Sequence, residues 1–285
     1  MNFFKSFLAS VLGTVVAFIF IGLLLMMSVA GIATAISSED SISVDISENS
    51  LLELDLDIPM FDNVGATQDI EQALGLGEDV LKYYDVIRAI RKAAKDDRIK
   101  GIDLQAQFPS MGWSQAQGIH KALQDFKAEG KFIYAYGDYF SQKGYYIASV
   151  SDSIFLHPMG GMEFKGLAAE VLYYKDFQEE YGFKMEVVRH GKYKSAVEPY
   201  LESEMSEANR TQIFSLLNSV WENISETIAT GRNLTTTQLN EIANGLKATQ
   251  PEHAQANGLI DALAYESDYD DKLKNALGIE SDSRL

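Results

Sequence analysis

The sequence contains no cysteine and few positive charges: 24 Lys and Arg stand against 41 Asp and Glu, which gives a formal net charge of −17. Without cysteine the chain forms no disulfide framework and carries no cysteine nucleophile or cysteine-based metal site. Phosphate binding needs clustered Lys and Arg, and we expect no such cluster in this acidic chain, which argues against nucleic acid as a partner. For the same reason it argues against peripheral binding to anionic lipid.

Histidine is also scarce, and its pattern carries no signature of metal chemistry. His120, His157, His190 and His253 are scattered, without the H-E-x-x-H spacing or any other three-ligand spacing. We therefore expect no metal and no cofactor. No G-x-S-x-G turn is present either, which argues against a Ser-His-Asp hydrolase.

A long uncharged segment occupies the N-terminus. No charged residue lies between Lys5 and Glu39, and residues 7–36 are mostly apolar. About 20 apolar residues suffice to cross a bilayer, whereas a secretory signal has an apolar region of only about 7–15. The length favours an uncleaved anchor, although Ala33-Thr34-Ala35 leaves a cleaved signal as the alternative. Lys5 precedes the segment and acidic residues follow it, so the positive-inside rule predicts a single-pass protein of the inner membrane with its N-terminus cytoplasmic and its domain periplasmic.

Beyond the anchor, strand and helix patterns alternate. Apolar periodicity predicts strands over 41–46, 51–58, 99–104, 132–136, 154–156 and 185–189, and helices over 79–95, 114–128, 139–150, 171–181, 207–230 and 239–244. Ser114 and Ser206 are the expected caps of two of these helices, and the apolar stripe of the helix over 207–230 is expected to pack in the core. This order predicts an α/β layered domain with a largely parallel sheet, whose functional loops lie at the carboxyl ends of its strands. We expect three parts: a cytoplasmic N-terminus and anchor over 1–38, strands and a mobile loop over 39–78, and the α/β repeat over 79–285.

One lysine stands out because of its position. Lys194 lies in "HGKYKSAVEPYLESEMS", which directly follows the predicted strand over 185–189. A lysine on a loop is usually a solvated surface cation. It becomes a general base only where burial lowers a lysine pKa from about 10.4 to roughly 7–8. Ser195 could hold such an amine by a hydrogen bond, whereas a nearby Glu198 would favour the charged form.

The stretch "GKYKSAVEPYLESEMSEANR" resembles the lysine-bearing motif of the signal peptide peptidase family, SppA, in its long form built from two repeats. Further similar stretches are "YGDYFSQKGYYIASVSDSIFLHPMGG", "GLAAEVLYYKDF" and "ANGLIDAL", so the resemblance covers nearly the whole chain and corresponds to the amino-terminal repeat. It implies a ClpP/crotonase-like fold and a membrane-anchored serine endopeptidase with a Ser-Lys dyad that degrades signal peptides. It also implies that Lys194 is the general base, that Lys192 has no catalytic role, and that the protein assembles as a homo-oligomer.

The sequence departs from that family pattern at two places. In the long form the nucleophilic serine belongs to a glycine-rich turn of the second repeat, and the corresponding turn here places Gln142, rather than Ser141, at the nucleophile position. The loop over 108–113 lacks paired glycines that would offer backbone N–H groups to an oxyanion. The chain could be a fragment, a split subunit or a degenerate copy.

Three hypotheses remain open at this point. The first is a peptidase half whose Lys194 activates a serine of a missing second repeat. The second is a non-enzymatic crotonase-like scaffold that binds peptides or partner proteins. The third is a self-sufficient Ser141–Lys194 dyad.

Overall fold

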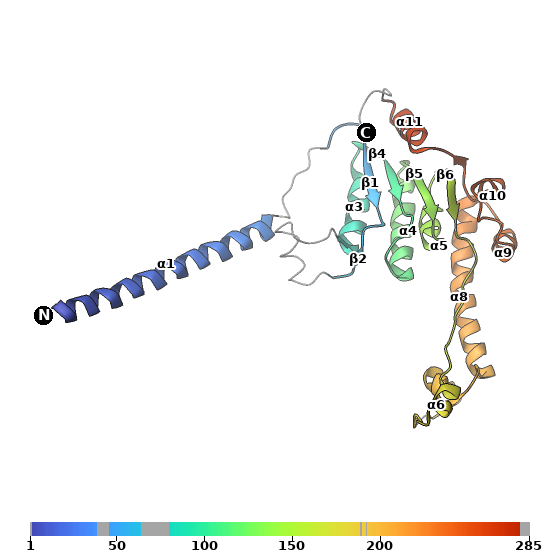
Figure 1. The fold of residues 1–285 in the computed structure, drawn as a ribbon. Helices are drawn as coiled ribbons and strands as arrows, with labels where there is room; N and C mark the ends of the chain where they lie inside the picture. The colour runs from blue at the N-terminus through green and yellow to red at the C-terminus, as the bar shows by residue number, and fades with distance from the viewer. Residues whose placement is uncertain (1, 39–45, 64–79, 189, 192, 280–285) are drawn as a thin grey trace.

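The computed structural model describes residues 2–38, 46–63, 80–188, 190–191 and 193–279 (Figure 1). The first element is the helix α1 (Asn2–Ser38). Its apolar part, Phe3–Gly31, is long enough to cross a membrane, and none of it is buried against the rest of the protein. Thr14 and Ser28 donate their hydroxyls to the carbonyls of Ser10 and Leu24 in the same helix, which satisfies these polar groups without water.

The centre of the domain is a five-stranded sheet with the order β1-β4-β5-β6-β7, in which every neighbouring pair is parallel. Its strands are β1 (Ser50–Asp55), β4 (Ile99–Gln105), β5 (Phe132–Phe140), β6 (Ser153–Met162) and β7 (Ala262–Leu263). A second, two-stranded parallel sheet pairs β2 (Met60–Phe61) with β3 (Leu81–Lys82). The predicted α/β layered class with a parallel sheet is confirmed.

Helices cover both faces of the large sheet. The main core packs the sheet against α3 (Tyr83–Lys95), α4 (Trp113–Ala128), α5 (Gln142–Ala148) and the second half of α8 (Glu207–Arg232). The opposite face is covered by α11 (Glu266–Leu277), whose Tyr269 packs on Tyr136 and Phe155. The helices α9 (Thr236–Asn244) and α10 (Pro251–Ala256) lead from α8 to β7.

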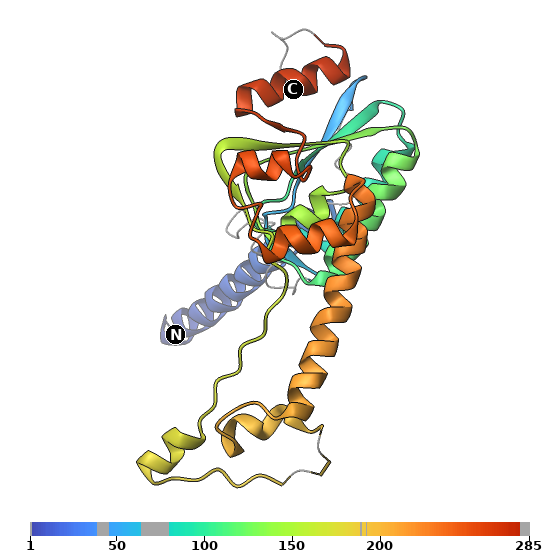
Figure 2. The ribbon, with the colours of Figure 1, turned by 90° about the vertical axis from the view of Figure 1, so that its right-hand side faces the viewer.

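A long arm projects from this domain. It consists of α6 (Lys175–Tyr181), the 3₁₀ turn η2 (Ser195–Val197), α7 (Glu198–Leu201) and the first half of α8, and Figures 1 and 2 show it extending away from the sheet. Tyr174 stacks on Tyr200 and donates its backbone N–H to Pro199 at 2.7 Å, so α6 and α7 pack against each other. Residues 163–174 form an extended connection back to β6.

The arm overturns two expectations from the sequence. Residues 185–188 form no strand, so the predicted strand over 185–189 is wrong over its described part, and the lysine motif does not follow a strand of the sheet. The apolar stripe of α8 is core only in its second half. Ile224 and Ile228 are buried, whereas Phe214 is 69% exposed.

Other boundaries differ in detail. The cap of α4 is Gly112 rather than Ser114, because Gln115 Oε1 accepts the Gly112 N–H at 2.7 Å. Ser206 caps α8 as predicted. The expected strand over 41–46, except Ile46, and most of the loop expected within residues 39–78 lie outside the described residues.

Candidate active site

Three loops meet at the carboxyl edge of the sheet, where a functional site is expected in a parallel α/β domain. They follow β4, β5 and β6. The Ser141 N–H donates to Gln107 O at 2.9 Å, which joins the β5 loop to the β4 loop. Gln107 Oε1 accepts the backbone N–H groups of Asp138 and Tyr139, which fixes the same two loops further.

Ser141 begins the turn that enters α5, and its hydroxyl acts as a helix cap. Its Oγ accepts the N–H of Gly144 at 3.1 Å. Gly144 cannot carry a side chain, since a Cβ there would lie 2.0 Å from Ala106 O. The turn therefore presses α5 closely against the end of β4, and the Ser141 oxygen satisfies an N–H that the first turn of a helix leaves unpaired.

Gln142 is the residue that the resemblance aligns with the nucleophile position. Its side chain is buried, and its amide oxygen accepts the N–H groups of Lys165 at 3.0 Å and Gly166 at 2.9 Å. Its amide nitrogen donates to Gly166 O at 2.9 Å. A carboxamide is no nucleophile, and this one joins the β5 turn to the segment after β6. Its role at this position is structural.

The N–H groups after β4 are also occupied. Asp57 accepts the N–H of Gln107 at 3.1 Å and that of Phe108 at 2.6 Å. Burial raises the pKa of the Asp57 carboxyl, and the two backbone N–H donors oppose that shift. An oxyanion site consists of neighbouring N–H groups that donate to a negatively charged oxygen. Here the carboxylate of Asp57 already accepts both N–H groups. The sequence analysis did not predict this role of Asp57. The feature of the sequence that could have revealed this role is an acidic residue just beyond the end of β1.

Lys143 is a second residue that sequence reasoning missed. It lies in the same turn as Ser141, donates from Nζ to Met111 O, and sits over the ring of Trp113 at 5.9 Å. Burial lowers the pKa of its ammonium group. Because its amine is bound to a carbonyl of the β4–α4 loop, Lys143 holds that loop against the α5 turn.

Lys194 lies on the arm, exposed to solvent, immediately before η2. Its N–H donates to Gly191 O at 3.3 Å. The arm that carries it extends away from the carboxyl edge of the sheet (Figure 2), so the structure does not bring Lys194 together with the turn of Ser141. Lys192 lies outside the described residues.

Glu198 fixes the lysine motif to α8. It is 1% exposed, and its carboxylate accepts the Ser206 hydroxyl at 2.6 Å and the Asn209 amide at 3.0 Å. A carboxylate at a helix N-terminus is stabilised by the unpaired N–H groups and by the helix dipole. The role of Glu198 is therefore to hold the turn that presents Lys194.

The family model for peptidase family S49 matches residues 125–280, which is more than half of the chain. The chain belongs to peptidase family S49. Protease 4 of Haemophilus influenzae is 32% identical over 279 residues, an alignment that covers 93% of this chain and 45% of that protein. The chloroplastic serine protease SPPA of Arabidopsis thaliana is 31% identical over 196 residues, covering 68% of this chain and 28% of that protein. The chain thus spans less than half the length of these curated relatives.

Among solved structures, a membrane-bound stomatin-specific protease is similar to this S49 chain with 17% identity and a TM-score of 0.41. The match covers 71% of this chain and 83% of that protein.

Proposed function

We propose that this S49 chain is the lysine-bearing, amino-terminal half of a membrane-anchored serine endopeptidase that degrades signal peptides. In this proposal Lys194 is the general base, and the serine nucleophile belongs to a second repeat. The observation that carries it is a separation: the lysine motif is displayed on a projecting arm, while the turn at the sheet edge holds Gln142 where a nucleophile would stand.

The proposed chemistry assigns one proton transfer to this chain. The neutral amine of Lys194 takes the proton of the serine hydroxyl of the second repeat, which we call the partner. The serine oxygen attacks the peptide carbonyl, and the proton then passes to the leaving amine as the peptide bond breaks. An exposed ammonium cannot accept a proton. Docking of the partner on the arm would remove water from Lys194 and favour the neutral amine. In this proposal the N–H groups for the oxyanion come from the second repeat, because Asp57 already accepts those of Gln107 and Phe108.

The surface of the arm supports a partner there. Apolar side chains that a soluble domain normally buries are exposed along it, including Phe177 at 50%, Tyr181 at 66% and Phe214 at 69%. An exposed apolar surface of this kind is typical of a protein–protein interface. We propose that the second repeat covers the arm and that further copies join to form a homo-oligomer.

Serine-directed labelling tests the proposal. The full chain alone should take no label from a fluorophosphonate and cleave no peptide. Addition of a polypeptide containing the second repeat should produce labelling on that polypeptide, and only while Lys194 is intact. Labelling of Ser141 in the lone chain would contradict the proposal and support a self-sufficient dyad.

A non-enzymatic scaffold is the second candidate. It is favoured by the two groups that fill the reactive positions of this chain, the Gln142 amide and the Asp57 carboxylate. A chain of this kind would bind unfolded peptides tightly and produce no labelling even with the second repeat present.

The membrane part of the proposal rests on α1. We propose that α1 stays attached as a single span of the inner membrane, with its N-terminus cytoplasmic and the domain periplasmic. Protease added outside spheroplasts should digest the domain, and a protected full-length band would contradict this orientation. An N-terminus near Ser37 in the mature protein would reveal a cleaved signal instead.

A further inference from the structure

The outer face of α3 is strongly basic, although the chain as a whole is acidic. Residues 82–100 include seven of the 24 Lys and Arg and only three Asp, so this stretch carries +4 and leaves −21 on the rest of the chain. The expectation that Lys and Arg do not cluster is therefore wrong for α3. The negative net charge of the whole chain conceals this cluster. A count of charged residues over successive short segments of the sequence would have found it.

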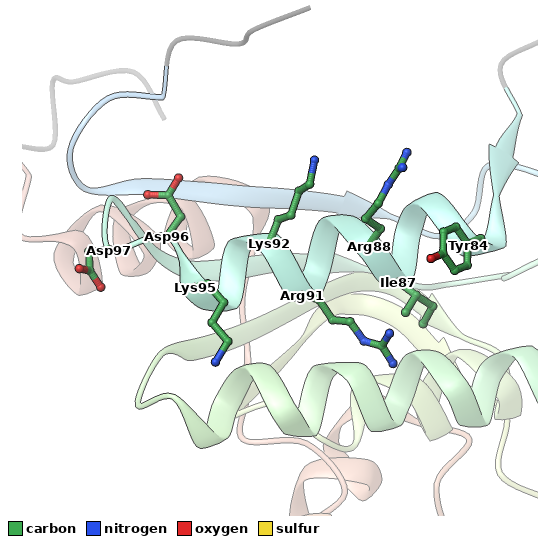
Figure 3. Close-up of a pocket in the computed structure, with 8 residues that line it drawn as sticks. All are labelled: Tyr84, Ile87, Arg88, Arg91, Lys92, Lys95, Asp96 and Asp97. Carbon is green, nitrogen blue, oxygen red and sulfur yellow. The ribbon is translucent and has the colours of Figure 1, made fainter. Parts of the chain in front are cut away.

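Four of these residues form what we call the basic face: Arg88, Arg91, Lys92 and Lys95. All four are exposed and line one open groove of about 700 Å³ together with Tyr84 and Ile87. Figure 3 shows them in two rows, with Arg88 and Lys92 on one side of the helix and Arg91 and Lys95 on the other. Residues four apart are neighbours along one side of a helix, so each row presents two adjacent cations.

Acidic neighbours neutralise only part of this face. Asp85 pairs with Arg88 at 2.8 Å, and Glu129 pairs with Lys95 at 3.1 Å. Asp96 and Asp97 both line one end of the groove, and Asp96 forms its salt bridge with Arg98, which does not belong to the basic face. Within the part of the chain that the structure describes, no salt bridge is formed by Arg91 or Lys92. Among the described residues, the centre of the face therefore carries two cations, Arg91 and Lys92, that form no salt bridge.

An aromatic ring extends the face at the N-terminal end of α3. Tyr84 is 67% exposed, and the Arg88 guanidinium lies 6.0 Å from the centre of its ring. Tyrosine is enriched where membranes meet water, because its ring tolerates the acyl boundary while its hydroxyl stays hydrated. Cations spread along a helix beside such a ring can each meet a different phosphate of a lipid layer. A single free phosphate would instead need several cations that point towards one place.

The chain connects this face closely to the anchor. Arg98, three residues beyond the end of α3, donates from Nη1 to Ile46 O at 3.1 Å and accepts the N–H of Ser50 at 2.9 Å. Ile46 lies eight residues after Ser38, where α1 ends. Eight residues span at most about 29 Å, so Ile46, which Arg98 contacts just beyond α3, stays within that distance of the end of the anchor. A tether this short gives the basic face a high effective concentration at the membrane.

We infer that the basic face of α3 docks on anionic phospholipid headgroups of the membrane that holds α1. The inference rests on the anchor proposed above. Anionic lipid attracts the +4 stretch and repels the acidic remainder, so the charge distribution selects one orientation of the domain. Each cation near an anionic surface strengthens the attraction about fivefold. The domain would thus lie on the bilayer with α3 facing the lipid.

Lysine modification in nanodiscs tests this inference with the full-length chain. The discs contain phosphatidylcholine alone or an equal mixture with phosphatidylglycerol, and mass spectrometry follows the acetylation rates of Lys92 and Lys95. Both rates should fall about fivefold or more in the anionic discs, whereas that of Lys121, an exposed lysine of α4, should not change. Raising NaCl from about 0.1 M to about 1 M shortens the screening length from about 10 Å to about 3 Å and should remove the protection.

The double variant Arg88→Gln/Arg91→Gln keeps both reporter lysines and removes two cations. It should weaken docking about 25-fold and abolish the protection, while Arg210→Gln, a matched exposed arginine of α8, should retain it. Equal lysine reactivity in neutral and anionic discs would overturn the inference. Protection by free inorganic phosphate in neutral discs, or by added oligonucleotide, would overturn it in favour of a soluble anion. Failure of the chain to enter either disc would instead refute the anchor.

Discussion

The side chain of Gln142 and the backbone of Gly166 form a reciprocal pair: Gln142 Nε2 donates to Gly166 O at 2.9 Å, and Gly166 N donates to Gln142 Oε1 at 2.9 Å. The pair ties the turn before α5 to the segment that leaves β6 for the arm. Gln142 therefore helps to hold the base of the arm.

Replacement of this glutamine by serine should not create a peptidase. In Gln142→Ser the shorter side chain cannot reach the backbone of Lys165 and Gly166, and the buried groups left unpaired should lower the free energy of unfolding by about 1–3 kcal/mol. Denaturant unfolding measures that loss, with Gln124→Ser on the exposed side of α4 as the control. Fluorophosphonate labelling of the variant should stay absent. Labelling at position 142 would show that a base and an oxyanion site already lie at the turn.

Loss of the Glu198 carboxylate should loosen the arm. In Glu198→Ala the Ser206 hydroxyl and the Asn209 amide lose a buried partner, a change that costs about 1–3 kcal/mol. Faster hydrogen exchange and proteolysis should be confined to α6, α7 and the first half of α8, because the second half of α8 packs in the core. Glu204→Ala removes an exposed carboxylate nearby and should leave exchange unchanged. Unfolding of the whole domain would contradict the local role.

Lys194 should matter for catalysis and little for stability. With the second repeat present, Lys194→Ala should lower peptide hydrolysis by at least about 10²–10⁴, the usual contribution of a general base. The midpoint of thermal unfolding should stay nearly constant, because the side chain is exposed. Lys192→Ala is the matched control and should retain activity. Equal losses in the two variants would show that Lys194 has been wrongly assigned.

His120 should make the domain sensitive to acid. It is 3% exposed, its ring lies 5.1 Å from that of Tyr146, and burial lowers its pKa from 6.5 to about 4. Because the unfolded chain then binds the proton first, the contribution of His120 is full above pH 6.5 and is lost as the pH falls towards 4. Between about pH 7.5 and pH 5 the loss amounts to about 2 kcal/mol.

Unfolding in denaturant at both pH values measures this effect. His120→Phe, which keeps an aromatic ring, should remove most of the pH dependence, whereas His253→Gln at an exposed position should not. A wild-type chain whose stability stayed constant over this range would contradict the burial of a neutral imidazole.

Local pattern alone was sufficient for several elements of this protein. The apolar run of α1, the strands β4 and β5 and the Ser206 cap of α8 could be predicted, because each depends on neighbouring residues in the chain. The lysine motif and its family resemblance were also readable from the sequence. Local pattern predicted the wrong structure where a segment had no neighbouring strand to pair with. Residues 185–188 are rich in strand formers but meet no neighbouring strand, and a single strand cannot satisfy its own N–H and C=O groups.

Only the tertiary structure decided which apolar and charged faces are covered. The stripe of α8 has one helical period throughout, yet Ile228 is fully buried and Phe214 is 69% exposed, because the sheet extends beneath only the second half. The same packing separates Lys194 from the turn of Ser141 and leaves the cations of α3 outward. Periodicity shows which side of a helix is apolar. Whether another element covers that side depends on contacts between residues distant in the chain, which no local pattern contains.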